Sequence, residues 1–260
     1  MSDPNSPLED FKRANAAAFR AISGHVEADV AYGTEPAHMT GERARLPAPA
    51  RDLPPEEVAR ARGEGDQLAI RLRHHDAQVH ARRMPGGDVA PVVFDALESA
   101  RIEAVGSRHM SGVQSNMAAA LEQRYQRMGY HRIRERTEAT LPEVVRLLAR
   151  ERLTGLTPPP AAQLAVEAWR PYLQGKIASD LEKLAGLVHD QDAYASMARQ
   201  LIQDMDIDIR AEEPGDGGED GEDQQSEAME DNQVQGQEEG EDGGDDAEAQ
   251  ALQEGPVRTI

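Results

Sequence analysis

The feature that most limits how this chain can fold is the uneven distribution of its acidic residues. Residues 211–260 hold 18 of the 48 Asp and Glu residues but only one basic residue, Arg258, which gives this segment a net charge of −17. Residues 1–210 have a net charge of −3, and together the two parts make the −20 of the chain. A segment so rich in charge buries too little apolar surface to offset its loss of conformational entropy. The pattern predicts a folded domain over residues 6–210 and a disordered acidic tail over residues 211–260.

The same charge distribution argues against several classes of protein. A body close to neutral offers no basic surface for phosphates, and the acidic tail repels nucleic acid, so no nucleic-acid partner is expected. No run of about 18 apolar residues is present, so no membrane partner is expected. Residues 1–11 are polar and lack the apolar region of a signal peptide. Cysteine is absent, which suits a reducing compartment, and we predict a cytoplasmic protein.

The apolar residues favour a mainly α-helical fold. Aromatic residues make up only 3% of the chain, and small aliphatic side chains suit closely packed helices. Near the N-terminus, Ser6 and Pro7 are typical of a helix start and Gly24 of a helix end. Alternation over residues 26–32 and a short extended segment at 43–46 predict a small β-hairpin. The fold class is therefore mainly α, a multi-helix domain with this hairpin near its N-terminus.

Helical spacing of apolar residues and the Gly and Pro residues between the segments define the remaining helices. The first of them is a long helix that Gly63 and Gly65 are expected to interrupt. The predicted helical segments cover residues 54–84, 91–106, 113–128, a helix beginning at 141, and two or three helices between 161 and 204.

One candidate site is a group of histidines and an aspartate at residues 74–80. On a helix, Leu72 and His75 share an apolar stripe, so His75 is expected to point into the core. Asp76 and His80 are one turn apart on an adjoining face, where they could share a metal ion or a proton. With the Glu98 and Glu103 carboxylates, His75, Asp76 and His80 could serve a metal-dependent hydrolase, which is the alternative function, but a helical His/Asp pair supplies too few ligands for a complete site. The alternative is a buried, hydrogen-bonded His75 beside a solvated charged face.

A second candidate is the charged face formed by Asp95, Glu98, Arg101 and Glu103. Glu98 and Arg101 are three residues apart and are expected to pair. The carboxylates could serve acid–base chemistry, but a salt-bridged face that orients neighbouring helices explains them as well. The sequence also lacks a P-loop, a nucleophile elbow and the His-Glu-x-x-His motif. We therefore expect no catalytic, cofactor-binding or metal-binding residue in this chain.

Short segments distributed along residues 6–250 resemble a known family when they are taken together and in order. They are Leu8–Arg13, Arg43–Pro47, Arg62–Asp66, Arg71–Asp76 with His80, Phe94–Gly106, Leu153–Gly155, Trp169–Pro171 and Asp204–Met205, followed by the long acidic segment. This ordered set looks like the N-terminal domain and acidic linker of the CobT family, the CobT-type subunits of aerobic cobaltochelatase.

The resemblance implies a role in a three-subunit enzyme of aerobic cobalamin biosynthesis. In that family the largest subunit binds the corrin, an AAA+ ATPase subunit hydrolyses ATP, and the CobT-type subunit joins the AAA+ ring. The implied reaction is ATP-dependent insertion of Co(II) into hydrogenobyrinic acid a,c-diamide. The complex uses ATP, Mg²⁺ and Co²⁺, and we expect this chain to bind none of them as a cofactor. The chain itself is then a non-catalytic assembly subunit within an oligomeric ring assembly.

The resemblance also implies a C-terminal von Willebrand factor A domain with an Asp-x-Ser-x-Ser metal motif. That motif does not occur in this sequence, which is expected to lack the domain, so no metal-site residue can be assigned from the family. The segments that carry the resemblance contain charged residues expected to contact the partner. These residues are Arg62, Asp66, His75, His80, Glu98, Arg101 and Glu103.

Overall fold

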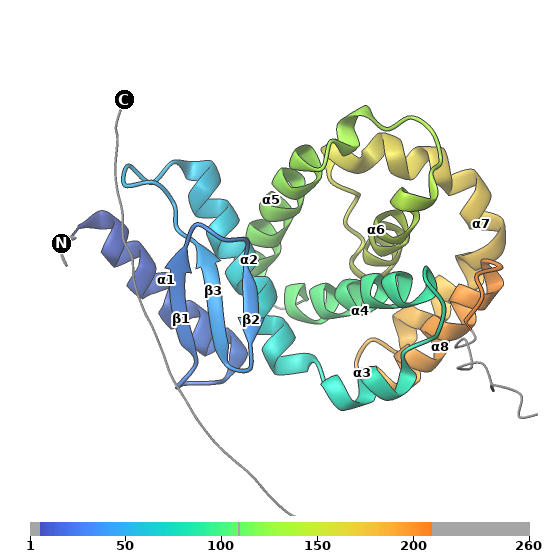
Figure 1. Cartoon of the computed structure of the whole chain (residues 1–260), viewed down its shortest axis with the longest axis horizontal. Helices are drawn as coiled ribbons and strands as arrows, with labels where there is room; N and C mark the ends of the chain where they lie inside the picture. Colours follow the sequence, from blue (N-terminus) through green and yellow to red (C-terminus); the bar gives the residue numbers. More distant parts are fainter. Residues whose placement is uncertain (1–5, 109, 210–260) are drawn as a thin grey trace, which may run out of the picture. The chain divides into compact units, whose positions relative to one another are not determined.

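The computed structural model describes residues 6–108 and 110–209 (Figure 1). The predicted acidic tail, residues 211–260, lies outside the described residues, so its disorder stays a prediction. The described part of the chain is mainly α-helical and has a three-stranded sheet near its N-terminus, which confirms the predicted fold class. None of the helices in these residues is both long enough and apolar enough to cross a membrane.

The first helix, α1, spans Pro7–Ser23 and has the ends that the sequence predicts. The Ser6 side chain accepts a hydrogen bond from the backbone N–H of Glu9 at 3.4 Å and so caps the N-terminus. Gly24 ends the helix with φ 76°, a left-handed conformation that favours glycine. The buried face of α1, which includes Phe11 and Phe19, packs against the helix that follows the sheet.

The sheet consists of β1 (Asp29–Gly33), β2 (His38–Thr40) and β3 (Arg43–Pro47), in the order β1-β3-β2. A hairpin is present, but β2 and β3 form it, around Gly41 with φ 58°. The two strands expected to form the hairpin, β1 and β3, pair in parallel instead, because the additional strand β2 reverses the chain between them. In Figure 1 this small sheet lies beside α1 and α2.

The predicted long helix is divided into α2 (Pro55–His74) and α3 (Ala77–Arg83), but the break is not at the glycines. The α2 helix continues through Gly63 and Gly65, and the chain leaves it at His75. At Gly63 a Cβ atom would lie 2.7 Å from the Cβ of Ala120. Glycine at this position therefore allows α2 and α5 to approach closely, and the expectation that it interrupts the helix was wrong.

The rest of the described chain surrounds α4 (Ala90–Ser107), as Figure 1 shows. This helix contacts α2, α5, α6 and α8, and buried residues occur on all of its faces. The surrounding elements are α5 (Ser111–Arg127), α6 (Leu141–Thr154), α7 (Gln163–Gly186) and α8 (Gln191–Asp204), with short 3-10 helices at Tyr130–Arg132, Glu138–Thr140 and Pro160–Ala162. The largest apolar cluster joins α4, α5, α6, α7 and α8, and most of the residues of α4 are buried.

Candidate functional site

The central helix α4 carries charged side chains into the protein interior. Glu98, Arg101 and Glu103 are only 3%, 2% and 1% exposed. Removing a charge from water costs several kcal/mol unless a partner and further hydrogen bonds compensate for it. The arrangement of these partners therefore determines what the site can do.

Glu98 is paired twice. Arg101 donates from Nε to Glu98 Oε2 and from Nη2 to Oε1, both at 2.7 Å, which confirms the predicted pair. The Nδ1 atom of His75 lies 2.7 Å from Oε1 of the same carboxylate. Burial alone would raise the pKa of Glu98, but the hydrogen bonds from Arg101 and His75 outweigh burial and hold this pKa below its usual value. Glu98 is thus a carboxylate that remains charged inside the fold.

Arg101 also connects segments that are distant in the sequence. Its Nη2 atom donates to the backbone carbonyl of His74 at 2.7 Å, at the C-terminal end of α2. Its Nη1 atom donates to the carbonyl of Val188 at 3.3 Å, in the segment that precedes α8. The guanidinium therefore compensates the negative end of one helix dipole and fixes α2, α4 and the start of α8 to one another.

His75 and His80 come together as the sequence suggested, but Asp76 is not part of the group. The two imidazole rings have centroids 4.9 Å apart, and His80 Nε2 lies 2.7 Å from Asp95 Oδ1. Asp76 instead caps α3, where its side chain accepts from the backbone N–H groups of Gln78 and Val79. The expectation that Asp76 and His80 share a metal ion or a proton is corrected accordingly.

The structure offers a different three-residue group that could hold a cation. One ligand atom each from His75, His80 and Glu98 lies within 4.8 Å of the others, and these side chains are at most 10% exposed. Both oxygens of Glu98, however, already accept hydrogen bonds from Arg101. A second guanidinium, that of Arg71, lies 3.3 Å from His75 Nε2. A divalent cation would have to compete with these guanidinium groups for the same atoms, so the arrangement fits an ion-pair network better than a metal site.

A second buried network surrounds Glu103. Arg146 on α6 donates to Glu103 Oε1, with the Nε contact at 3.1 Å, and Arg150 Nε lies 3.2 Å from Oε2. Glu143 extends this network, since it pairs with Arg146 and accepts a hydrogen bond from Tyr125 at 2.7 Å. The sequence analysis did not predict these partners of Glu103. Arg146 and Arg150 are four residues apart on α6, and this spacing on one helix face is the signal that could have indicated them.

The seven residues expected to contact the partner are therefore mostly internal. Asp66 is 4% exposed and accepts a hydrogen bond from Asn116 at 2.8 Å, while burial raises the pKa of its carboxyl. Arg62 alone among the seven has an exposed side chain, and its guanidinium lies over the ring of Phe11. That these residues contact the partner stays a prediction. The six internal residues could affect partner binding only indirectly, by holding the helices in position.

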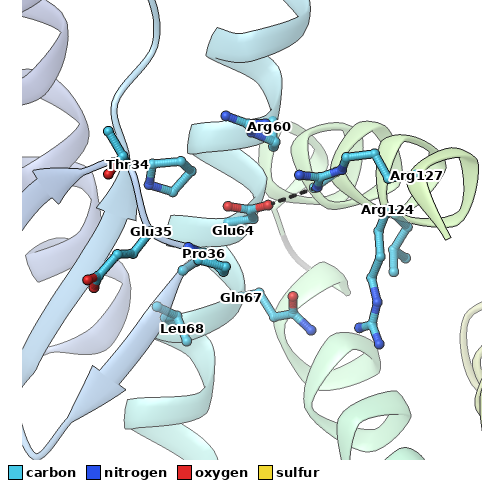
Figure 2. A pocket seen from close by; sticks show the side chains of 13 residues that line it. Thr34, Glu35, Pro36, Arg60, Glu64, Gln67, Leu68, Arg124 and Arg127 are labelled. Atoms are coloured by element: carbon cyan, nitrogen blue, oxygen red, sulfur yellow. Dashed lines mark hydrogen bonds and ion pairs between the residues drawn. The ribbon is translucent and has the colours of Figure 1, made fainter. Parts of the chain in front are cut away.

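A surface pocket that the sequence did not predict lies between the sheet, α2 and α5 (Figure 2). It has a volume of about 390 Å³. Three guanidinium groups and one partly buried carboxylate line it, together with Gln67 and the loop between β1 and β2. These charged residues are Arg60 and Glu64 on α2 and Arg124 and Arg127 on α5, and we call this site the arginine pocket. The spacing of four residues between Arg60 and Glu64, and of three between Arg124 and Arg127, indicates that each pair shares one face of its helix. The spacing does not indicate that these faces of α2 and α5 lie opposite each other.

The described residues form a mainly helical protein in which buried ion pairs connect the helices. Among residues 6–108 and 110–209, we find no group of side chains arranged as a catalytic site. The family model described as "Cobalamin biosynthesis protein CobT" matches residues 5–257, so the chain belongs to this family of cobalamin biosynthesis proteins. No solved structure matches the chain.

Proposed function

We propose that this chain is the assembly subunit of an aerobic, ATP-dependent cobaltochelatase. In this role it joins the AAA+ ATPase subunit to the large corrin-binding subunit during insertion of Co(II) into hydrogenobyrinic acid a,c-diamide. The observation that carries the proposal is the family match over residues 5–257. Co(II) is the substrate of this reaction, and ATP and Mg²⁺ belong to the other subunits of a ring-shaped assembly.

The internal ion pairs support a structural role for this chain. Glu98 is paired with Arg101 and His75, and Glu103 is paired with Arg146 and Arg150, so each buried carboxylate already has positively charged or hydrogen-bonding partners within the fold. Buried and hydrogen-bonded charges tie α2, α4, α6 and α8 into one arrangement. A subunit that presents a fixed surface to an ATP-driven partner benefits from such an arrangement.

Cobalt insertion in a reconstituted mixture tests the proposal. The mixture contains the corrin-binding subunit, the AAA+ subunit, ATP, Mg²⁺, Co²⁺ and the corrin, with or without this chain, and insertion is followed by the change in corrin absorbance. We expect insertion only when the chain is present, and a mixture without ATP is the control. Insertion at the same rate without the chain overturns the proposal.

Association with the AAA+ subunit provides a second test that does not depend on chemistry. We expect the two proteins to co-elute at micromolar concentration in size-exclusion chromatography. Arg62→Glu reverses the one exposed charge among the seven expected contact residues, and Arg51→Glu, another exposed arginine, is its matched control. Weaker co-elution of the first variant alone would place Arg62 at the interface. Failure of the unaltered chain to co-elute would count against an assembly role.

The second candidate function is a metal-dependent hydrolase, and the observation on its side is that ligand atoms of His75, His80 and Glu98 lie within 4.8 Å of one another. Asp76, the third residue that the sequence suggested, is occupied as the cap of α3. A hydrolase of this kind requires a stoichiometric metal ion, and binding of that ion to the folded state alone would raise the unfolding temperature. We expect no such rise with Zn²⁺, Mn²⁺ or Co²⁺, and a rise that His80→Ala abolishes would favour the hydrolase.

A further inference from the structure

The arginine pocket contains a hydrogen-bond donor and an acceptor that both lack partners. Arg60 Nε and Glu64 Oε2 are buried, and neither has a hydrogen-bond partner among the described residues. The two side chains as a whole are only partly buried and line the pocket, so they can turn toward a ligand. An unpaired polar group inside a protein costs free energy. A molecule that offers an acceptor to Arg60 and a donor to Glu64 would remove this cost.

The charges that line the pocket favour an anion. Arg127 Nη2 lies 3.4 Å from Glu64 Oε1, a long contact for an ion pair, and this is the dashed line in Figure 2. Arg124 differs because it pairs closely with a glutamate on α6. Glu35 is exposed, and in Figure 2 its carboxylate points away from the three guanidinium groups. Within the pocket, Arg60 and Arg127 therefore share the single carboxylate of Glu64.

Glu64 also needs more than these two arginines provide. Burial raises the pKa of Glu64, and the attraction of Arg60 and Arg127 only partly counteracts the effect of burial. A hydrogen bond donated to the carboxylate by a ligand would stabilise its charged form. The pocket is thus matched by a ligand that is an anion and a hydrogen-bond donor at once.

We propose that the arginine pocket binds inorganic phosphate in its hydrogen phosphate form. Arg60 and Arg127 donate to the phosphate oxygens, and the O–H group of the phosphate donates to Glu64. Planar guanidinium groups bind phosphate through paired hydrogen bonds, which suits the two arginines to this ligand. Hydrogen phosphate carries acceptors and a donor in one ion, so it matches both unpaired groups of the pocket. The proposal goes beyond the assembly role and does not depend on it.

The carboxylate of Glu64 makes the pocket selective among anions. Sulfate is tetrahedral like phosphate but carries no proton at neutral pH, so its oxygens would face the Glu64 acceptor without a donor between them. A phosphate monoester such as methyl phosphate loses its last proton with a pKa of about 6 and has the same defect. A site built to hydrogen-bond one group of a ligand discriminates against analogues that lack this group. The net charge of −20 further disfavours polyanions such as nucleic acids.

Isothermal titration calorimetry of the full chain tests this selectivity. The probes are inorganic phosphate, sulfate and methyl phosphate, each at about pH 7.5, above the last pKa of a monoester. Sodium chloride at about 0.15 M screens the charges outside the pocket. We expect saturable binding of phosphate with a dissociation constant of about 1 mM or below, because two guanidinium groups contact it. Sulfate and methyl phosphate should bind about tenfold more weakly, since each leaves Glu64 without a donor.

A pair of double variants separates the pocket from general electrostatic attraction. Arg60→Gln with Arg127→Gln should weaken phosphate binding about tenfold or more, since each lost charge-assisted hydrogen bond weakens binding severalfold. Arg51→Gln with Arg82→Gln removes the same charge from exposed sites outside the pocket and should leave phosphate binding unchanged.

Two single variants test the role of Glu64. Glu64→Gln replaces an acceptor-only group by an amide that can donate to either anion, so phosphate and sulfate should then bind within about threefold of each other. Glu35→Gln removes the same charge from the exposed acidic residue of the pocket and should keep the preference for phosphate. Unfolding midpoints measured for each variant ensure that the comparison is made between folded proteins.

Three results would overturn the proposal. The first is the absence of saturable phosphate binding to the unaltered chain. The second is an equal loss of phosphate binding in the pocket double variant and in its control. The third is binding of sulfate or methyl phosphate that is as tight as binding of phosphate to the unaltered chain. Such a result would mean that Glu64 does not accept a hydrogen bond from the ligand and that hydrogen phosphate is not the preferred anion.

Discussion

Arg146 on α6 donates hydrogen bonds from both Nε and Nη2 to a single oxygen of Glu103 on α4, and neither side chain is more than 3% exposed. Arg150 approaches the other oxygen of the same carboxylate at 3.2 Å. Burial alone would lower the pKa of Arg146, but Glu103 outweighs this effect and raises the pKa above its ordinary value. One carboxylate therefore compensates two guanidinium groups at the contact between α4 and α6.

Glu103→Gln should destabilise the fold strongly. The substitution keeps the size of the side chain but removes the fully buried countercharge of Arg146 and Arg150, and it leaves Arg146 only the longer contact with Glu143 at 3.5 Å. Breaking a buried ion pair from one side costs about 3–5 kcal/mol. Urea unfolding at neutral pH measures the loss. The control is Glu182→Gln, because the pair of Glu182 with Arg152 is exposed and contributes about 1 kcal/mol or less. Equal losses in the two variants would contradict a central role for Glu103.

Glu98 should make the stability of the fold sensitive to acid. Its pKa is lower in the folded state than the ordinary value of 4.5, so its contribution is present above that value. The contribution is lost as the pH falls through the lowered pKa, because the carboxylate must then take up a proton. We expect Glu98→Gln to be less stable than the unaltered chain at neutral pH, and the difference to shrink below about pH 4.5.

Urea midpoints measured over this pH range test the expectation for Glu98. The control is Asp95→Asn, since the Asp95 side chain is 59% exposed and pairs only with His80 among the described contacts. A difference between Glu98→Gln and the unaltered chain that stays constant with pH would show that the loss comes from packing rather than from charge.

The sequence predicted those parts of the fold and the site that depend on neighbouring residues. The ends of α1 were predictable because Ser6, Pro7 and Gly24 act within one helical turn. The pair of Glu98 and Arg101 was predictable for a similar reason, since side chains three residues apart on a helix face each other.

Other features depend on contacts between distant segments and so could not be predicted in this way. Glu103 and Arg146 are 43 residues apart, and only the packing of α4 on α6 brings them together. His75 ends α2 because Asp76 caps the next helix, whereas Gly63 stays helical because α5 packs against it. The arginine pocket likewise forms only where α2 and α5 pack against each other, and no pattern of neighbouring residues predicts that contact.

Asp76 should behave as a helix cap and not as a metal ligand. The backbone N–H groups of Val79 and Gln78 donate to its carboxylate and lower its pKa. Asp76→Ala removes the acceptor, so the midpoint of thermal unfolding should fall, whereas Asp76→Asn retains an acceptor and should stay close to the unaltered chain. Cobalt insertion in the reconstituted mixture should be the same for the Asn variant and the unaltered chain. A loss of activity with an unchanged midpoint in Asp76→Asn would instead indicate a chemical role.

The same substitution, Gly→Ala, should have opposite effects at two positions in helices. At Gly63 the added Cβ would meet the backbone of Asn116 and lie 2.7 Å from the Cβ of Ala120, so α2 and α5 would have to separate. Such overpacking costs about 1–3 kcal/mol, and more where backbone has to move. At Gly175, on the exposed side of α7, a Cβ would have no neighbour within 4 Å among the described atoms. Alanine there should therefore raise stability by about 0.5–1 kcal/mol through its higher helix propensity.

Urea unfolding of Gly63→Ala and Gly175→Ala, each compared with the unaltered chain, decides between packing and propensity at these two sites. Both variants gain the helix propensity of alanine, so the difference between their free energies of unfolding isolates the cost of the contact between α2 and α5. Stabilisation of both variants would mean that α2 and α5 are less closely packed than the structure shows.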